Sequence, residues 1–202
     1  MKGKVSKNKF LKVVLPALLV VAIICQAVGF QAVLAKGNVA TTSSDSISNL
    51  TDQQLQALTN PILQSYKADS SHKVWKMTDD SRLAVLANQT NIENARLQEV
   101  VKLVNSEFVE KEIISSPLAM VYAQERDVSY GDILIDIDQT SSITSSSNSK
   151  EAYKITIGEN GVRLTGASEN AIMHGLRTIQ NLIITNDGLV YGEIVDYPNV
   201  AE

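Results

Sequence analysis

The stretch EAYKITIGENGVRLTGASENAIMHGLRTIQNLIITNDGLVYGEIVDYP, residues 151–198, decides the fold. Its first part alternates apolar and polar residues in the manner of a half-buried strand, with apolar side chains at Tyr153, Ile155 and Ile157. The alternation resumes after Asn160-Gly161, at Val162 and Leu164. Because Asn-Gly tolerates the positive φ values of a two-residue type I′ turn, the sequence predicts a β-hairpin with this pair at its turn.

A helix and a further strand are predicted after the hairpin. Ser168 is a suitable N-cap and Glu169 suits the positive end of the helix dipole, and apolar residues then recur every three or four positions, at Ile172, Leu176, Ile179 and Ile183. This pattern predicts a helix of about four turns that ends at Asn186-Asp187-Gly188. The run from Val190 to Val195 predicts a strand that leads to Pro198, a residue that disfavours helix at Tyr197.

The order of these segments resembles a known family. The chain has Gly175-Leu176-Arg177-Thr178-Ile179-Gln180-Asn181-Leu182, followed by Ile194-Val195-Asp196-Tyr197-Pro198, after a turn that ends in Gly161-Val162. In this order and spacing, the segments are similar to the N-terminal domain of family 20 glycoside hydrolases, the β-N-acetylhexosaminidases. The resemblance is clearest over residues 151–202 and extends more weakly back to about Arg82. A similar module precedes the barrel of family 84 N-acetylglucosaminidases, so the pattern identifies the module better than the reaction.

The resemblance implies a non-catalytic domain. In family 20 the chemistry lies in a following (β/α)8 barrel, where an adjacent Asp-Glu pair works with the substrate's acetamido group instead of using two carboxylates alone. This chain has no candidate for that pair, and a barrel needs roughly 250 residues. We therefore expect a truncated fragment that ends before the barrel, with no catalytic, cofactor-binding or metal-binding residues. The expected structural or domain-junction residues are Gly161, Gly175, Asp196 and Pro198, and Asp196 is expected to fix the connection by hydrogen bonds.

The N-terminus has the pattern of a signal peptide. Five lysines precede an apolar run from Val13 to Phe30, and Val33-Leu34-Ala35 suits a signal peptidase site. We expect cleavage after Ala35 and a secreted or cell-surface protein, with an uncleaved N-terminal anchor as the alternative. Residues 36–49 are rich in Ser, Thr and Ala, which predicts a flexible linker.

The composition excludes several classes of protein. The only cysteine, Cys25, lies in the leader, so the remainder has neither disulfides nor thiolate metal sites. Loss of the five leader lysines leaves 13 of the 18 basic residues against 22 acidic ones, a formal charge of −9. This charge argues against nucleic acid or an anionic membrane surface as a partner.

The middle of the chain predicts the rest of one α+β domain. Residues 50–80 are expected to be an N-terminal extension packed on a domain that spans residues 81–202. The extension is predicted to hold a short helix from Thr51, a break at Pro61, a second helical turn that ends near Tyr66, and a strand at Val74–Met77 in which Trp75 packs in the core. Within the domain, strands are predicted at 81–87, 118–122 and 132–138, and a helix at Thr90–Glu112 begins with a Thr90/Glu93 capping box. Its apolar face consists of Leu97, Val101, Val104 and Phe108. The sum is a mostly antiparallel sheet with two helices on one face.

Other candidates for chemistry have simpler explanations. Asp132, Asp136 and Asp138 alternate along an extended strand and are expected to form a solvated face, because such spacing does not wrap a calcium ion. His72 and His174 are isolated, whereas zinc needs three or four protein ligands. Gly158 to Gly161 is explained by the hairpin turn without a phosphate.

Two hypotheses for function remain open. In the first, the chain is the non-catalytic domain of a secreted enzyme that acts on terminal N-acetylglucosamine or N-acetylgalactosamine of glycans, and its partner is the catalytic barrel. In the second, it is a free-standing extracellular module that binds glycans or a protein. Five per cent aromatic residues provide little material for a sugar-stacking platform, which favours the first hypothesis.

Overall fold

The structure is a computed structural model that describes residues 47–139, 143 and 150–197. These residues belong to one compact unit, residues 40–202. The expected signal peptide, most of the expected linker, most of the Ser/Thr-rich segment 139–150 and Pro198 lie outside the described residues. At the end of the expected linker, Ile47 is 1% exposed and belongs to the core.

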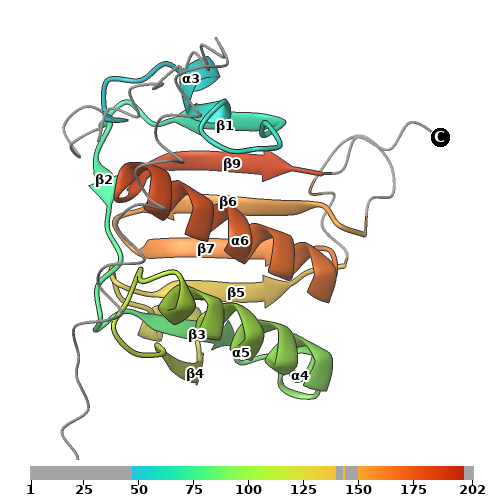
Figure 1. Cartoon of the computed structure of the whole chain (residues 1–202). Coiled ribbons are helices and arrows are strands. Elements are labelled where there is room, and N and C mark those ends of the chain that lie inside the picture. Colours follow the sequence, from blue (N-terminus) through green and yellow to red (C-terminus); the bar gives the residue numbers. More distant parts are fainter. Residues whose placement is uncertain (1–46, 140–142, 144–149, 198–202) are drawn as a thin grey trace, which may run out of the picture. The chain divides into compact units, whose positions relative to one another are not determined.

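A seven-stranded mixed sheet forms the centre of the unit (Figure 1). In spatial order its strands are β1 (Ser65–Ala68), β9 (Gly192–Asp196), β6 (Tyr153–Gly158), β7 (Gly161–Gly166), β5 (Ile133–Ile137), β3 (Arg82–Leu86) and β4 (Ala119–Ala123). Pairing is antiparallel from β1 to β7 and parallel from β7 to β4. A separate antiparallel pair joins β2 (Val74–Trp75) to β8 (Leu189–Val190).

Two long helices cover one face of the sheet (Figure 1). They are α5 (Ala95–Glu110) and α6 (Glu169–Asn186), and they pack against each other as well as on the strands. The predicted apolar face of α5 is confirmed, since Leu97, Val101, Val104 and Phe108 are all fully buried. The remaining helices are short: α3 (Asp52–Gln56), α4 (Gln89–Ile92) and the 3₁₀ helix η1 (Glu125–Asp127). The prediction of an α+β fold with two helices on one face is confirmed.

The start of α5 differs from the prediction. Thr90 and Glu93 do not form a capping box at the head of one long helix; the segment divides into α4 and α5. Asn88 caps α4 and Asn94 caps α5, each by accepting a hydrogen bond from the backbone N–H three residues later. The break places the fully buried Asn91 where its amide contacts β5, through an Nδ2 to Asp136 Oδ1 distance of 3.0 Å.

The segment after Pro61 is a strand. The first predicted helix is confirmed as α3, and Thr51 with Gln54 forms a capping box there. The second helical turn is wrong, because residues 65–68 pair with β9 as the edge strand β1. Tyr66 is 1% exposed, and its hydroxyl donates to the Val190 carbonyl oxygen at 2.8 Å. Thus the expected extension, residues 50–80, contributes a strand to the main sheet.

The hairpin is confirmed, but its turn lies one residue earlier than predicted. Gly158 pairs with Gly161, so Glu159 and Asn160 occupy the turn and only Gly161, at φ +91°, has a positive φ there. A type I′ turn requires positive φ at both central residues, so the type I′ assignment is wrong.

Two of the three aspartates in and beside β5 are buried and do not lie on a solvated face, and the third, Asp138, is half-buried. Asp132 is 1% exposed and Asp136 is 7% exposed. Asp132 pairs with Arg82, at 2.9 Å from Nε to Oδ1 and 2.5 Å from Nη2 to Oδ2. Asp136 accepts hydrogen bonds from Asn91, Asn88 and Arg163. The prediction correctly assigns the isoleucines and the aspartates to opposite faces of the sheet. However, polar side chains and the loop around η1 cover the face with the aspartates as well.

Candidate functional site

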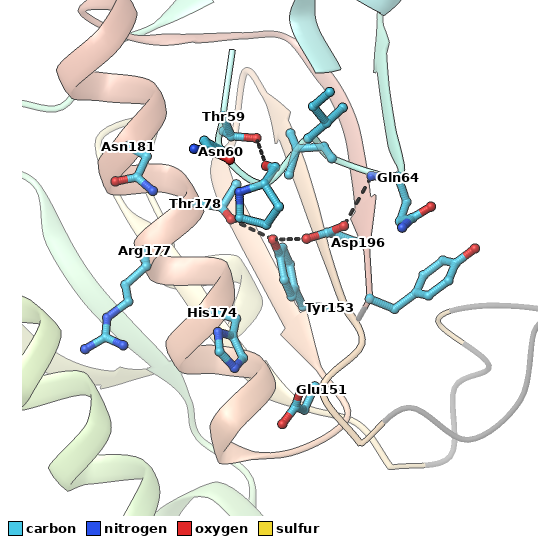
Figure 2. Close-up of a pocket in the computed structure, with 14 residues that line it drawn as sticks. Thr59, Asn60, Gln64, Glu151, Tyr153, His174, Arg177, Thr178, Asn181 and Asp196 are labelled. Atoms are coloured by element: carbon cyan, nitrogen blue, oxygen red, sulfur yellow. Dashed lines mark hydrogen bonds between the residues drawn. The ribbon is translucent and has the colours of Figure 1, made fainter. Parts of the chain in front are cut away.

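A hollow of about 370 Å³ opens beside α6 (Figure 2). One wall is the segment 59–64, which precedes β1, and the opposite wall is the outward side of α6, with His174, Arg177 and Asn181. Tyr153 of β6 and Asp196 of β9 lie between them. The last described residue, Tyr197, also lines the hollow, so the chain leaves the sheet at this point.

Asp196 joins several elements at the floor of the hollow. Its Oδ2 accepts a hydrogen bond from the Tyr153 hydroxyl at 2.8 Å, and its Oδ1 accepts one from the backbone N–H of Gln64 at 3.2 Å. Because Tyr153 donates its proton to Asp196, the 2.6 Å contact between Tyr153 and Thr178 has the Thr178 hydroxyl as donor. The chain of hydrogen bonds therefore connects β9 to the segment before β1, to β6 and to α6.

Burial keeps the Tyr153 phenol in this chain of hydrogen bonds protonated. Tyr153 is 3% exposed, and burial, followed by the nearby Asp196 charge, raises the pKa of its phenol above the ordinary value. The phenol is therefore a permanent donor near neutral pH. Both Asp196 oxygens accept hydrogen bonds within the fold, from Tyr153 and from the backbone of Gln64.

The other expected structural residues have separate positions. Gly175 lies on α6 where the helix crosses the hairpin, and a side chain there would collide with Leu164 and lie 3.2 Å from Tyr153. Gly161 is the first residue of β7, directly after the hairpin turn and at the far end of β6 from the hollow. The structure thus places Asp196 and Gly175 next to the same residue, Tyr153 of β6. Gly161 lies apart from them. Their assignment to a domain junction stays a prediction.

The two long helices differ in charge. Five of the 16 residues of α5 are charged, namely Arg96, Glu99, Lys102, Glu107 and Glu110, whereas α6 carries only Glu169 and Arg177 in 18 residues. Arg177 is neutralised by Glu107, with an Nη2 to Oε1 distance of 2.6 Å. The hydrogen bonds from Arg177 lower the pKa of Glu107, so the pair stays ionised near neutral pH. The outward side of α6 is therefore nearly free of net charge.

Exposed apolar side chains extend this weakly charged surface. Ile62, at the rim of the hollow, is 66% exposed, and Ile184, in the last turn of α6, is 53% exposed. We call the outward side of α6 together with segment 59–64 the α6 surface.

Two carboxylates line the hollow, and they lie apart. Its carboxylates are Glu151 and Asp196, and Figure 2 shows Glu151 well away from the hydrogen-bonded Asp196. In the part of the chain that the structure describes, no group of three or more His, Cys, Asp and Glu side chains is placed to hold a metal ion. The same residues include no helix that is both long and apolar enough to cross a bilayer.

Sequence reasoning missed most of the hollow. Tyr153 was expected only as an inward apolar residue of a strand, and Thr178 only as part of the family pattern. A signal does exist: Thr178 lies between Gly175 and Leu182 on the buried side of a helix, where a polar residue needs a partner. Trp75 was correctly expected in the core. It is fully buried, and its indole N–H donates to the Tyr130 carbonyl oxygen at 2.6 Å, so it is not a platform for sugars.

The profile of glycosyl hydrolase family 20, domain 2, matches residues 59–197, which is more than half of the chain. The chain therefore belongs to this family and contains its domain 2, as the resemblance implied. The match begins before residue 81, where we expect the domain to begin, and so includes β1 and β2. No curated protein sequence matches the chain.

Solved structures show the same fold. The N-acetyl-β-hexosaminidase of Streptomyces plicatus is 15% identical, with a TM-score of 0.52, and the match covers 75% of this chain and 28% of that enzyme. The chitobiase of Flavobacterium johnsoniae is also 15% identical with a TM-score of 0.52, over 74% of this chain and 22% of that enzyme. The chain thus spans about a quarter of the length of these enzymes.

Proposed function

We propose that this chain is the non-catalytic N-terminal domain of a secreted β-N-acetylhexosaminidase and that it supports a catalytic (β/α)8 barrel by docking against it. Membership of family 20, domain 2, supports the domain's role. The substrate would be terminal N-acetylglucosamine or N-acetylgalactosamine of glycans, reached only through the barrel. Secretion by the leader, with cleavage after Ala35, is part of the proposal.

The α6 surface is the proposed docking face, and one observation carries this choice. The chain reaches Tyr197 at the edge of the hollow beside α6, the less charged of the two long helices, so a domain that follows residue 197 begins next to this surface. Ile62 and Ile184 are available for apolar contacts there, while α5 exposes Leu103 but also carries five charged residues. Interfaces within a chain need such apolar centres with polar surroundings.

The first step of the test is to sequence the DNA that follows codon 202. All reading frames and the neighbouring gene are searched for a family 20 barrel. Residues 40–202 and that barrel are then produced together with different tags. Ile62→Arg is expected to lower the amount of barrel that co-purifies by about tenfold, because it places a charge in an apolar contact. Leu103→Arg is the matched control, since Leu103 is 51% exposed on α5. The absence of a barrel gene, or equal losses in both variants, would contradict the proposal.

A further inference from the structure

The strand β4 is an edge that lacks the usual protection. It is the last strand of the sheet, and among the described residues it pairs only with β3. Natural edge strands are commonly guarded by a lysine, a proline or a bulge. The sequence of β4, Ala-Met-Val-Tyr-Ala, contains neither lysine nor proline, and its pairing with β3 runs without interruption from Ala119 to Ala123.

The direction of the backbone N–H and C=O groups shows which residues of β4 have groups that are open to a further strand. The Ala123 carbonyl oxygen accepts from the Ala87 N–H at 2.9 Å, so the polar groups of Ala123, and by alternation those of Val121 and Ala119, face β3. The N–H and C=O groups of Met120 and Tyr122 therefore face away from the sheet. Just before the strand, the Asn105 side chain occupies both backbone groups of Leu118, at 2.9 Å each. The open groups thus begin at Met120.

The strand is complementary to itself. When two copies run antiparallel with Val121 at the two-fold axis, Ala119 lies opposite Ala123 and Met120 lies opposite Tyr122. The Met120 and Tyr122 backbone groups then exchange both N–H···O bonds of a hydrogen-bonded pair. On the helix side, each Met120 thioether contacts a Tyr122 ring, which is a favourable sulfur–aromatic contact. Tyr122 is 47% exposed, so its ring is accessible for this contact.

Charge favours a second copy over an acidic or basic partner strand. Residues 113–124 contain no charged side chain, although residues 36–202 carry a formal charge of −9. Two copies of an acidic protein approach each other only through a surface without like charges. We propose that two copies of this chain pair antiparallel through β4, centred on Val121, and join their sheets into one.

This contact is compatible with docking on the α6 surface. β4 and β1 are the two opposite edges of the sheet, and segment 59–64 of the α6 surface precedes β1 (Figure 1). An edge contact of one short strand belongs with the weak specific interfaces, so we expect a dissociation constant on the order of 10 to 100 μM.

Sedimentation equilibrium of residues 40–202 at up to about 1 mM tests the proposal. Tyr122→Lys is expected to weaken dimerisation at least tenfold, because it places a charge opposite Met120 of the second copy. Tyr130→Lys is the control: Tyr130 is an equally exposed tyrosine, at 45%, in the loop before β5. Tyr122→Pro removes an outward N–H and leaves the β3 pairing intact, so it is expected to weaken the dimer too. Circular dichroism shows whether each variant is folded.

A charge exchange tests the register. Met120→Glu and Tyr122→Lys are each expected to be monomeric, and a mixture of the two is expected to dimerise, because opposite charges then lie across the axis. A wild-type protein that stays monomeric at about 1 mM overturns the proposal and leaves the edge to another occupant. Equal dimerisation of Tyr122→Lys and the wild type, or a mixture that stays monomeric, also overturns it.

Discussion

Gly161 tolerates no side chain, for two independent reasons. Its φ of +91° is unfavourable for any other residue, and a Cβ would lie 2.6 Å from the Asp132 carbonyl oxygen and 2.8 Å from that of Ser129. We expect Gly161→Val to lower the free energy of unfolding by about 3 kcal/mol. Urea denaturation of residues 40–202 measures this loss. Gly158→Ala is the control, because a Cβ on Gly158 would have no neighbouring atom within 4 Å, and an equal loss in both variants would contradict the explanation.

Asp132 makes stability depend on pH. Burial opposes its charge, but hydrogen bonds from Arg82 and Ser129 outweigh burial and hold the pKa below its ordinary value of 3.8. A carboxylate with a lowered pKa in the folded state stabilises fully above its unfolded-state pKa, and this stabilisation is lost as the pH falls through the folded-state value. We expect Asp132→Asn to cost about 2 kcal/mol near pH 6 and progressively less as the pH falls below 3.8.

The measurement is the difference in unfolding free energy between Asp132→Asn and the wild type across this pH range. Asp80→Asn, at an exposed position, is the control and is expected to change stability little at any of these pH values. A difference for Asp132→Asn that stays constant with pH would contradict the role of the ionised carboxylate.

Single polar residues were the hardest feature to predict. The alternation along residues 132–138 correctly placed the isoleucines in the core, but alternation assigns a side and not a degree of burial. Asp132 and Asp136 are covered because Arg82, Asn88 and Asn91 come from segments more than 40 residues away. No local pattern contains those partners.

At the scale of elements, the division between α4 and α5 has a measurable consequence. Asn94 caps α5, and its Nδ2 also donates to Glu169 Oε1 at 2.6 Å, which joins the beginnings of α5 and α6. We expect Asn94→Ala to lower the unfolding free energy by about 1 to 2 kcal/mol. If Thr90 capped the helix, Thr90→Ala would lower the unfolding free energy equally. We expect it to lower the unfolding free energy by less than about 0.5 kcal/mol. Thermal and urea denaturation compare the two, and a larger loss at Thr90 would contradict the observed caps.

Elements with local signals were predicted well. The hairpin and α6 depend on a glycine turn, an N-cap and a helical period, all of which lie within the segment itself, and α6 ends as predicted, with Asp187 in the left-handed region at φ 58°. β1 was missed because its conformation depends on β9, whose residues lie more than 120 positions later. A short segment near a proline contains too few residues for the spacing of its apolar side chains to distinguish a strand from a helix.

For the whole molecule, the sequence predicted the class of fold but not the arrangement of the sheet. Strand order depends on pairing between distant segments, and the crossover through α5 makes β3 and β4 parallel. The hollow depends on the same arrangement, because segment 59–64, β6, β9 and α6 meet only after the sheet has formed. Thus the family pattern indicated the residues, and only the fold showed that Tyr153, Thr178 and Asp196 act together.

The last prediction concerns activity. Residues 40–202 are expected not to hydrolyse an aryl N-acetyl-β-glucosaminide, because the two carboxylates of the hollow lie apart and Asp196 is held by Tyr153 and Gln64. Glu151 is the other acidic side chain that lines the hollow. Release of the aryl group is measured against a blank prepared from cells without the gene. If turnover exceeds that blank and disappears in Glu151→Gln, the hollow contains an acid or base and the domain does not only support a barrel. If turnover persists in Glu151→Gln, it comes from a contaminating enzyme.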